Sequence, residues 1–129
     1  MSKKPKEEKL LTETELELIS ILWKLGEGSV ADVIDKLAKE RDLAYTSVST
    51  ILRILEQKKV LTTRKEGRGH VYIPVLTKDE YEERTVRHVV DHVFDGTPMA
   101  LAKQLLNTSR LSKEDLIELK KLIEKAEKS

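Results

Sequence analysis

The chain has 129 residues, 39% hydrophobic and 36% charged, with a net charge of +1, and its length suits one or two small domains. It contains no cysteine, which excludes disulfides, thiolate metal sites and cysteine nucleophiles. No apolar run approaches the length of a membrane span and the basic first residues lack the apolar core of a signal peptide, so we expect a cytoplasmic protein without membrane contact.

The first helix is predicted from its capping chemistry. Residues 1–10 form a charged lead that we expect to be mobile. Thr12 and Glu15 have the spacing of a capping box, in which a hydroxyl and a carboxylate each bind an unpaired backbone N–H. Apolar residues then recur at helical spacing until Gly26, which we expect to end the helix.

The next two helices form a helix-turn-helix pattern. Ser29 is the expected N-cap of a helix over about Val30–Arg41, and residues 42–44 form a short connector. A further helix over Tyr45–Gln57 follows, with apolar residues at i, i+3, i+4 and i+7 on one face. Two helices joined by so short a turn are typical of DNA-binding proteins.

The outer face of the Tyr45–Gln57 helix carries small hydroxyls and one long cation, where an ordinary solvated helix would mix in Glu and Lys. Hydroxyl groups bind phosphates and base edges, and arginine binds guanine with a two-pronged fork. The candidate base-reading residues are Thr46, Ser47, Thr50 and Arg53.

A β-hairpin is predicted after this helix because the periodicity changes from helical to alternating. Val60–Glu66 and His70–Pro74 form its strands, and Gly67–Gly69 forms a turn with Arg68 at its tip. Three helices and a hairpin in about 60–65 residues make a winged helix, in which Arg68 would lie over backbone phosphate or the minor groove. The same turn could also hold a single solvated charge, but its place after the helix pair favours DNA.

Positive charge is concentrated in this region. From Leu43 to Leu76 there are six basic and two acidic residues, a net charge of +4, whereas Thr77–Ser129 has a net charge of −1. The candidate phosphate and wing residues are Ser49, Lys58, Arg64, Lys65, Arg68 and His70.

The rest of the chain is predicted to be helical, over about Lys78–Asp95, Pro98–Leu106 and Lys113–Glu127, with Thr77, Thr97 and Ser112 as caps. Three short amphipathic helices can scarcely form a core alone, so we expect them to pack against a second copy. The fold class is thus mainly α: a winged-helix DNA-binding domain over 1–76, then a dimerisation module over 77–129. The candidate dimerisation residues are Val86, Val89, Val90, Val93, Leu101, Leu105, Leu116, Leu119 and Ile123.

Four polar residues lie one turn apart on the first of these helices: His88, Asp91, His92 and Asp95. Two histidines at this spacing can share a metal ion, but position 89 is valine, so the His-Glu-x-x-His motif is absent. A polar helix face with His–Asp pairs is the interpretation we favour, and we predict no metal and no cofactor. Since no nucleophile–base set and no glycine-rich phosphate loop is present, we also predict no enzymatic activity.

The chain resembles the penicillinase-repressor family (BlaI/MecI/CopY) over nearly its whole length. The resemblance lies in Leu-Thr-Glu-Thr-Glu at 11–15, Thr-Ser-Val-Ser-Thr-Ile-Leu at 46–52, Leu-Glu-Gln-Lys-Lys at 55–59 and Leu-Ser-Lys-Glu-Asp-Leu at 111–116. It implies a bacterial homodimeric repressor that binds a near-palindromic operator. Thr46, Ser47 and Thr50 match family positions on the recognition helix, and Arg68 lies in the matching wing.

The resemblance also implies ways of ending repression, and here the chain departs from the family. The copper branch uses Cys-x-Cys pairs, which are absent, and the Asn-Phe bond cut in the β-lactam branch is replaced by Gln104-Leu105. Ile54 stands where members of the family commonly have arginine. This change either moves the main base-reading cation to Arg53 or removes one contact with the DNA. Lys59 stands where glycine is usual, so the helix lacks its easy left-handed cap.

We therefore predict a homodimeric, sequence-specific transcriptional repressor whose partners are operator DNA and a second copy, with a regulatory protease or sensor protein as a further candidate. Two alternatives stay open. One is a metal-responsive regulator that uses His88 and His92. The other is a winged helix that binds a protein and has no operator. Salt titration distinguishes DNA binding from protein binding, because only binding to phosphates releases condensed counterions.

Overall fold

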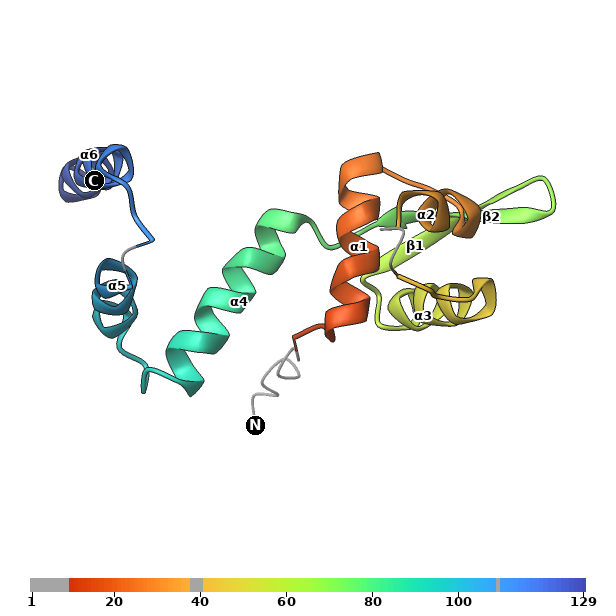
Figure 1. Cartoon of the computed structure of the whole chain (residues 1–129), viewed down its shortest axis with the longest axis horizontal. Coiled ribbons are helices and arrows are strands. Elements are labelled where there is room, and N and C mark those ends of the chain that lie inside the picture. The colour runs from red at the N-terminus through yellow and green to blue at the C-terminus, as the bar shows by residue number, and fades with distance from the viewer. Residues whose placement is uncertain (1–9, 38–40, 109) are drawn as a thin grey trace. The chain divides into compact units, whose positions relative to one another are not determined.

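A computed structural model describes residues 10–37, 41–108 and 110–129 (Figure 1). The predicted mobile lead at 1–10 lies almost wholly outside these residues. The elements are α1 (Glu13–Leu25), α2 (Val30–Lys36), α3 (Tyr45–Gln57), β1 (Leu61–Glu66), β2 (Gly69–Pro74), α4 (Lys78–His92), α5 (Pro98–Asn107) and α6 (Lys113–Glu127). This order confirms the predicted fold class of a winged helix followed by three helices.

The chain forms two compact units that meet between Thr85 and Val86, within α4. The first unit therefore contains the winged helix together with the first two turns of α4. The second contains the end of α4, α5 and α6. The predicted division of the chain into domains over 1–76 and 77–129 stays a prediction.

Local capping chemistry sets the starts of α1, α2, α4 and α6, as predicted. The Thr12 hydroxyl accepts a hydrogen bond from the Glu15 N–H at 3.1 Å, and the Glu15 carboxylate accepts one from the Thr12 N–H at 2.9 Å. Ser29 and Ser112 form the same box with aspartates three residues later. Thr97 is the N-cap residue of α5 and Pro98 is its first residue, as predicted, but the Thr97 side chain accepts no capping hydrogen bond.

Helix α2 is shorter than predicted. It ends at Lys36 because Leu37 takes an extended conformation, and residues 38–40 lie outside the described part of the chain. The prediction of a helix to Arg41 followed periodicity alone, and no glycine or proline marks the earlier end. By contrast, the predicted bounds of α3 and α6 are confirmed to the residue.

The core of the first unit lies between α1, α2, α3 and the hairpin. Leu18, Ile19 and Leu22 of α1 are fully buried against Leu52 and Leu55 of α3. Trp23 packs at the edge of this core, and its indole N–H donates to the Leu76 carbonyl at 2.9 Å. The first turn of α4 joins the same core through Tyr81.

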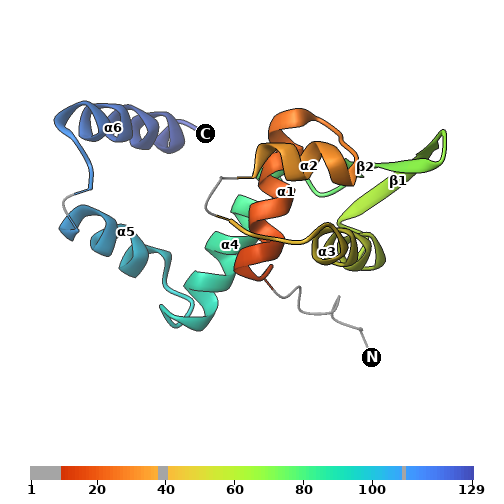
Figure 2. The ribbon, with the colours of Figure 1, turned by 45° about the vertical axis from the view of Figure 1, so that its right-hand side comes forward.

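The hairpin projects beyond the helices of the first unit (Figure 2). Its strands are antiparallel, with Leu61 opposite Pro74 and Glu66 opposite Gly69, so Gly67 and Arg68 form the turn. Gly67 has a φ of 61°, a conformation that favours glycine. At the base, Gly28 and Tyr72 exchange backbone hydrogen bonds of 2.7 and 3.0 Å, which fixes the hairpin to the loop before α2.

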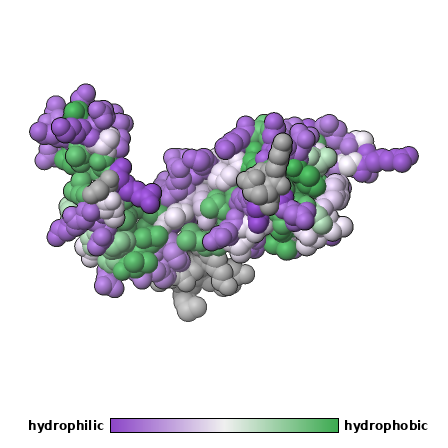
Figure 3. Space-filling view, in the orientation of Figure 1, coloured by the Kyte–Doolittle hydropathy of each residue, from purple (hydrophilic) through white to green (hydrophobic). Residues whose placement is uncertain are grey.

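The second unit buries little of its apolar surface. Neither α5 nor α6, both described in full, contains a buried residue. Figure 3 accordingly shows hydrophobic surface over α5 and the end of α4. Within the described residues, no helix combines the length and apolarity needed to span a bilayer.

Helix α3 is followed by a lysine, Lys59, whose backbone adopts the left-handed conformation. Lys59 has a φ of 65°, and the following Val60 N–H donates to the Leu55 carbonyl at 3.0 Å. The sequence indicated only that an easy glycine cap is missing here. The structure shows that the chain keeps the left-handed geometry and places a side chain in it, which costs about 1 kcal/mol.

We expect Lys59→Gly to raise the free energy of unfolding by about 0.5–1 kcal/mol, because glycine adopts this φ without steric cost. Denaturant unfolding of the variant measures the change. Lys59→Ala is the matched control, since it removes the same charge and keeps the Cβ. Equal stability of the glycine and alanine variants would contradict the assignment of strain to Lys59.

Candidate nucleic-acid interface

The outer face of α3 presents the predicted base-reading side chains to solvent. Val48, Leu52 and Leu55 on the opposite face are 0% exposed, so the rotation of the helix about its axis is fixed by the core. Four side chains are exposed as a result: Thr46, Ser47, Thr50 and Arg53. The first turn of α3 has neither a capping side chain nor an acidic residue, which leaves its backbone N–H groups suited to an anion.

A groove of about 400 Å³ separates α3 from the hairpin. Ser49 and Arg53 of α3 line one side of it, and Arg68 and His70 of the hairpin line the other. The fold thus brings together four predicted site residues from two separate segments. Thr46, Ser47 and Thr50 do not line the groove and lie on the exposed surface of α3 beside it.

Two residues bring other chemistry to the groove. Glu56 is the one carboxylate among its lining residues, and it accepts a hydrogen bond from the Thr63 hydroxyl at 2.9 Å. Burial raises the pKa of Tyr72, so its hydroxyl stays protonated at neutral pH and can donate. The groove is therefore rich in donors and carries two arginines against one carboxylate.

Arg64, a predicted phosphate ligand, is paired with carboxylates. Its guanidinium donates to both oxygens of Glu27, at 2.7 and 3.1 Å, and to Glu66 at 2.9 Å. The Arg64 hydrogen bonds hold the pKa of Glu27 below its ordinary value, and the two carboxylates raise the pKa of Arg64. The positive charge of Arg64 is thus already compensated by two carboxylates, which reduces its attraction for a phosphate.

Lys58 is likewise engaged, with its ammonium 2.7 Å from the buried Glu15 carboxylate. Burial raises the pKa of Glu15, but the hydrogen bonds from Lys58 and from Thr12 outweigh this and hold the pKa below its ordinary value. The bond joins the C-terminal end of α3 to the first turn of α1. In the described part of the chain, neither Lys65 nor Arg68 forms an ion pair.

Sequence reasoning missed several residues that line the groove, among them Tyr45, Ser29 and Ala31. Tyr45, at the start of α3, is 59% exposed, and an aromatic residue opening a polar helix face was the signal that could have found it. Ser29 and Ala31 reach the groove from the start of α2. They could not be found from sequence, because their position depends on how α2 packs on α3.

The predicted dimerisation residues are mostly accessible in the single chain. Val93 is 65% exposed and Ile123 is 53% exposed, and similar values hold for Val86, Leu105 and Leu116. Val90 is buried, whereas Val89, Leu101 and Leu119 are half-buried. Apolar side chains on α4, α5 and α6 are thus left without a cover within one chain.

The polar face of α4 brings its two histidines together. The rings of His88 and His92 stack with centroids 4.1 Å apart, and His92 Nδ1 lies 2.9 Å from the His88 carbonyl oxygen. Among the described residues, no group of three or more His, Asp or Glu side chains is placed to hold a metal ion. The described residues thus offer no third ligand beside His88 and His92, and a metal site there stays a hypothesis.

The chain is similar to known repressors over most of its length. A family model described as penicillinase repressor matches residues 11–125. The penicillinase repressor of Bacillus licheniformis is 28% identical over 114 residues, or 88% of this chain and 89% of that protein. The transcriptional regulator BlaI of Mycobacterium tuberculosis is 37% identical over 71 residues, or 54% of this chain and 51% of that protein. The solved DNA-binding domain of the repressor BlaI has a TM-score of 0.50 and 31% identity, covering 63% of this chain and 94% of that domain.

Glu15→Gln is expected to lower the free energy of unfolding by about 1–2 kcal/mol at neutral pH, because it weakens the charge-assisted bond from Lys58. The folded-state pKa of Glu15 is depressed, so the stabilisation is complete above the unfolded pKa and is lost as pH falls through the folded pKa. Denaturant unfolding from neutral pH to about pH 3 measures both effects.

The exposed Glu13, in the same turn of α1, gives the control variant Glu13→Gln. We expect the parent and the control to lose stability more steeply than Glu15→Gln below about pH 5. An acid dependence of Glu15→Gln equal to that of the parent would show that the pair with Lys58 does not stabilise the fold.

Proposed function

The chain belongs to the penicillinase repressor family, and we propose that it is a sequence-specific DNA-binding transcriptional repressor that acts as a homodimer on a near-palindromic operator. One observation carries the proposal: the fold places Arg53 of α3 and Arg68 of the hairpin on the two sides of one groove. The likeness to the DNA-binding domain of the repressor BlaI supports it. We infer that the protein is bacterial, works in the cytoplasm and has no enzymatic activity.

In this proposal, α3 enters the major groove and reads bases. Its buried inner face fixes which side chains meet the DNA. Arg53 binds guanine through its fork, while Thr46, Ser47 and Thr50 are short enough to let the helix approach base edges closely. Tyr45 joins them at the N-terminal end of the helix.

Phosphate contacts orient the protein on the duplex. Lys65 and Arg68 bind phosphates directly. Ser49 and His70, which line the groove with Arg68, and the uncapped first turn of α3 are further donors. Lys58 and Arg64 contribute less, because their charges are already paired with carboxylates. The electrostatic part of binding is therefore smaller than the net charge of the segment suggests.

Dimerisation covers the exposed apolar side chains of α4, α5 and α6. A small domain that leaves Val93, Leu105 and Ile123 half or more exposed gains stability by packing them against a second copy. Two-fold symmetry then places two α3 helices on successive major grooves, with half-sites about one helical turn, or a multiple of it, apart. A protease or sensor protein that ends repression is a further partner in this proposal.

The division between base reading and phosphate binding is tested with Arg53→Ala and Arg68→Ala. Arg53→Ala should cost about 1–3 kcal/mol on the operator and much less on a random duplex, because the guanine contact is sequence-specific. Arg68→Ala should weaken both duplexes similarly and reduce the log–log salt slope by about one. Salt titrations with the DNA upstream of the protein's own gene measure these effects.

Arg41→Ala serves as the control, since Arg41 is an exposed arginine that pairs with Glu17 and does not line the groove. Both DNA affinities should be unchanged in this variant. An equal loss on specific and random duplexes for Arg53→Ala would show that Arg53 binds phosphate and does not read bases.

Leu105→Asp tests the dimer, because burying a carboxylate in an apolar interface is costly. We expect the dimer dissociation constant to rise by at least about tenfold, equivalent to 1.4 kcal/mol, in sedimentation equilibrium. Gln104→Asp introduces the same charge at the neighbouring exposed position and should have a smaller effect. Identical dissociation constants for the two variants would place the interface elsewhere.

A further inference from the structure

Helix α3, which is described in full, has one exposed aliphatic residue, Ile54. Ile54 is 37% exposed and does not line the groove between α3 and the hairpin. Within the described part of the first unit, the other exposed large hydrophobic residues are Leu25, Tyr45 and Val75. Of these, Tyr45 alone belongs to α3, and it lines the groove. The outer face of α3 thus carries one apolar side chain outside the groove.

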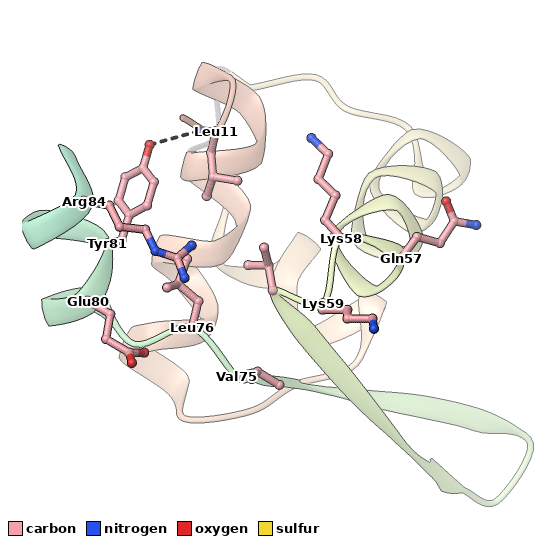
Figure 4. A pocket seen from close by; sticks show the side chains of 10 residues that line it. Leu11, Gln57, Lys58, Lys59, Val75, Leu76, Glu80, Tyr81 and Arg84 are labelled. Carbon is pink, nitrogen blue, oxygen red and sulfur yellow. Dashed lines mark hydrogen bonds between the residues drawn. The ribbon is translucent and has the colours of Figure 1, made fainter. Parts of the chain in front are cut away.

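The core of the first unit fixes the direction in which Ile54 points. The next residue, Leu55, is fully buried, and one residue of an α-helix turns the side chain by about 100°. Ile54 therefore shares its side of the helix with residues three, four and seven positions away, which are Gln57, Thr50 and Ser47, all of them exposed. In Figure 4, Gln57 extends from the end of α3 away from α1. Ile54 accordingly belongs to the surface that we assign to base reading.

The side chains that share this side of α3 with Ile54 are polar and uncharged. Ser47 and Thr50 carry hydroxyls and Gln57 carries an amide, so no carboxylate stands in this row to repel DNA. Arg53, the residue before Ile54, lines the groove and brings positive charge to the same helix. Short polar side chains let a helix approach base edges closely. An aliphatic side chain among them can add only an apolar contact.

We propose that Ile54 reads a thymine in each half-site of the operator by packing against the C5-methyl group of that base. This methyl is the apolar group that the major groove presents, and aliphatic and threonine methyl groups are suited to contact it. Cytosine at the same place presents an amino donor and no methyl group, and isoleucine would leave that donor without a partner. The assignment rests on the proposed function and adds an apolar contact to the hydrogen bonds from Arg53.

Replacement of single thymines by deoxyuridine isolates this contact, because it removes the methyl group and keeps the hydrogen-bonding edge of the base. The DNA upstream of the protein's own gene is footprinted first, and each thymine of the half-site is then replaced in turn, in both half-sites. Affinity of the full chain is measured at constant salt. At one thymine position we expect a loss of about three- to fourfold per half-site, or about tenfold in the complete operator, which corresponds to one buried methyl group per half-site.

Ile54→Ala identifies the side chain that makes the contact. We expect this variant to bind the unmodified operator about tenfold more weakly than the parent and to be insensitive to deoxyuridine at that one position. Leu25→Ala is the matched control, since Leu25 is an equally exposed aliphatic residue on α1, outside the groove. It should keep the parent affinity and the full effect of deoxyuridine. Circular dichroism of both variants establishes that they are folded.

Thr50→Ser is a second control, because Thr50 lies one turn before Ile54 on the same side and carries a methyl group of its own. The effect of deoxyuridine at the thymine assigned to Ile54 should persist in this variant. If the effect disappears in Thr50→Ser and persists in Ile54→Ala, the thymine is read by Thr50 and the proposal is wrong.

The remaining outcomes separate this proposal from the proposed function. A preference for the operator that depends on Arg53, without any thymine whose methyl group is coupled to Ile54, would overturn the role of Ile54 and leave the repressor standing. An equal loss of affinity for operator and random duplex in Ile54→Ala, or half-sites without thymine, would overturn it as well. Equal binding of operator and random duplex by the parent would overturn the proposed function, and the assignment of Ile54 with it.

Discussion

The structure depends on the burial of one face of α3. Val48, Leu52 and Leu55 are removed from water by α1 and the hairpin, and each such side chain stabilises the fold by about 1.5–3 kcal/mol relative to exposure. Because the helix is held by this face, it cannot rotate, and its hydroxyls and Arg53 must face solvent. The same core orients the hairpin through Leu61 and Tyr72, which places Arg68 opposite Arg53 across the groove.

Ion pairs then decide which cations are available to an anionic partner. Arg64 is held by Glu27 and Glu66, and Lys58 by Glu15, so two of the six basic residues between Leu43 and Leu76 are already compensated. The pair with Glu15 has a structural task, since it ties the end of α3 to the start of α1. Binding that leaves these pairs intact would draw on fewer phosphate contacts and would depend less steeply on salt.

Local chemistry made much of the fold predictable. The boxes at Thr12, Ser112 and Thr77 involve residues three apart, and the bounds of α3 follow from a strong apolar period. The pairing of Lys58 with Glu15 and of Arg64 with Glu27 joins residues 43 and 37 positions apart, which no local pattern encodes. For the same reason Ser29 and Ala31 could not be assigned to the groove, and the early end of α2 has no signal in its own residues.

Mapping amide chemical shifts during titration with operator DNA would test the central claim, that the outer face of α3 and the hairpin form one DNA-binding surface. We expect large changes over Tyr45–Arg53 and over residues 66–70, with small changes at Leu18 and Leu22 in the core. Changes confined to α5 and α6, or none on the hairpin, would contradict it.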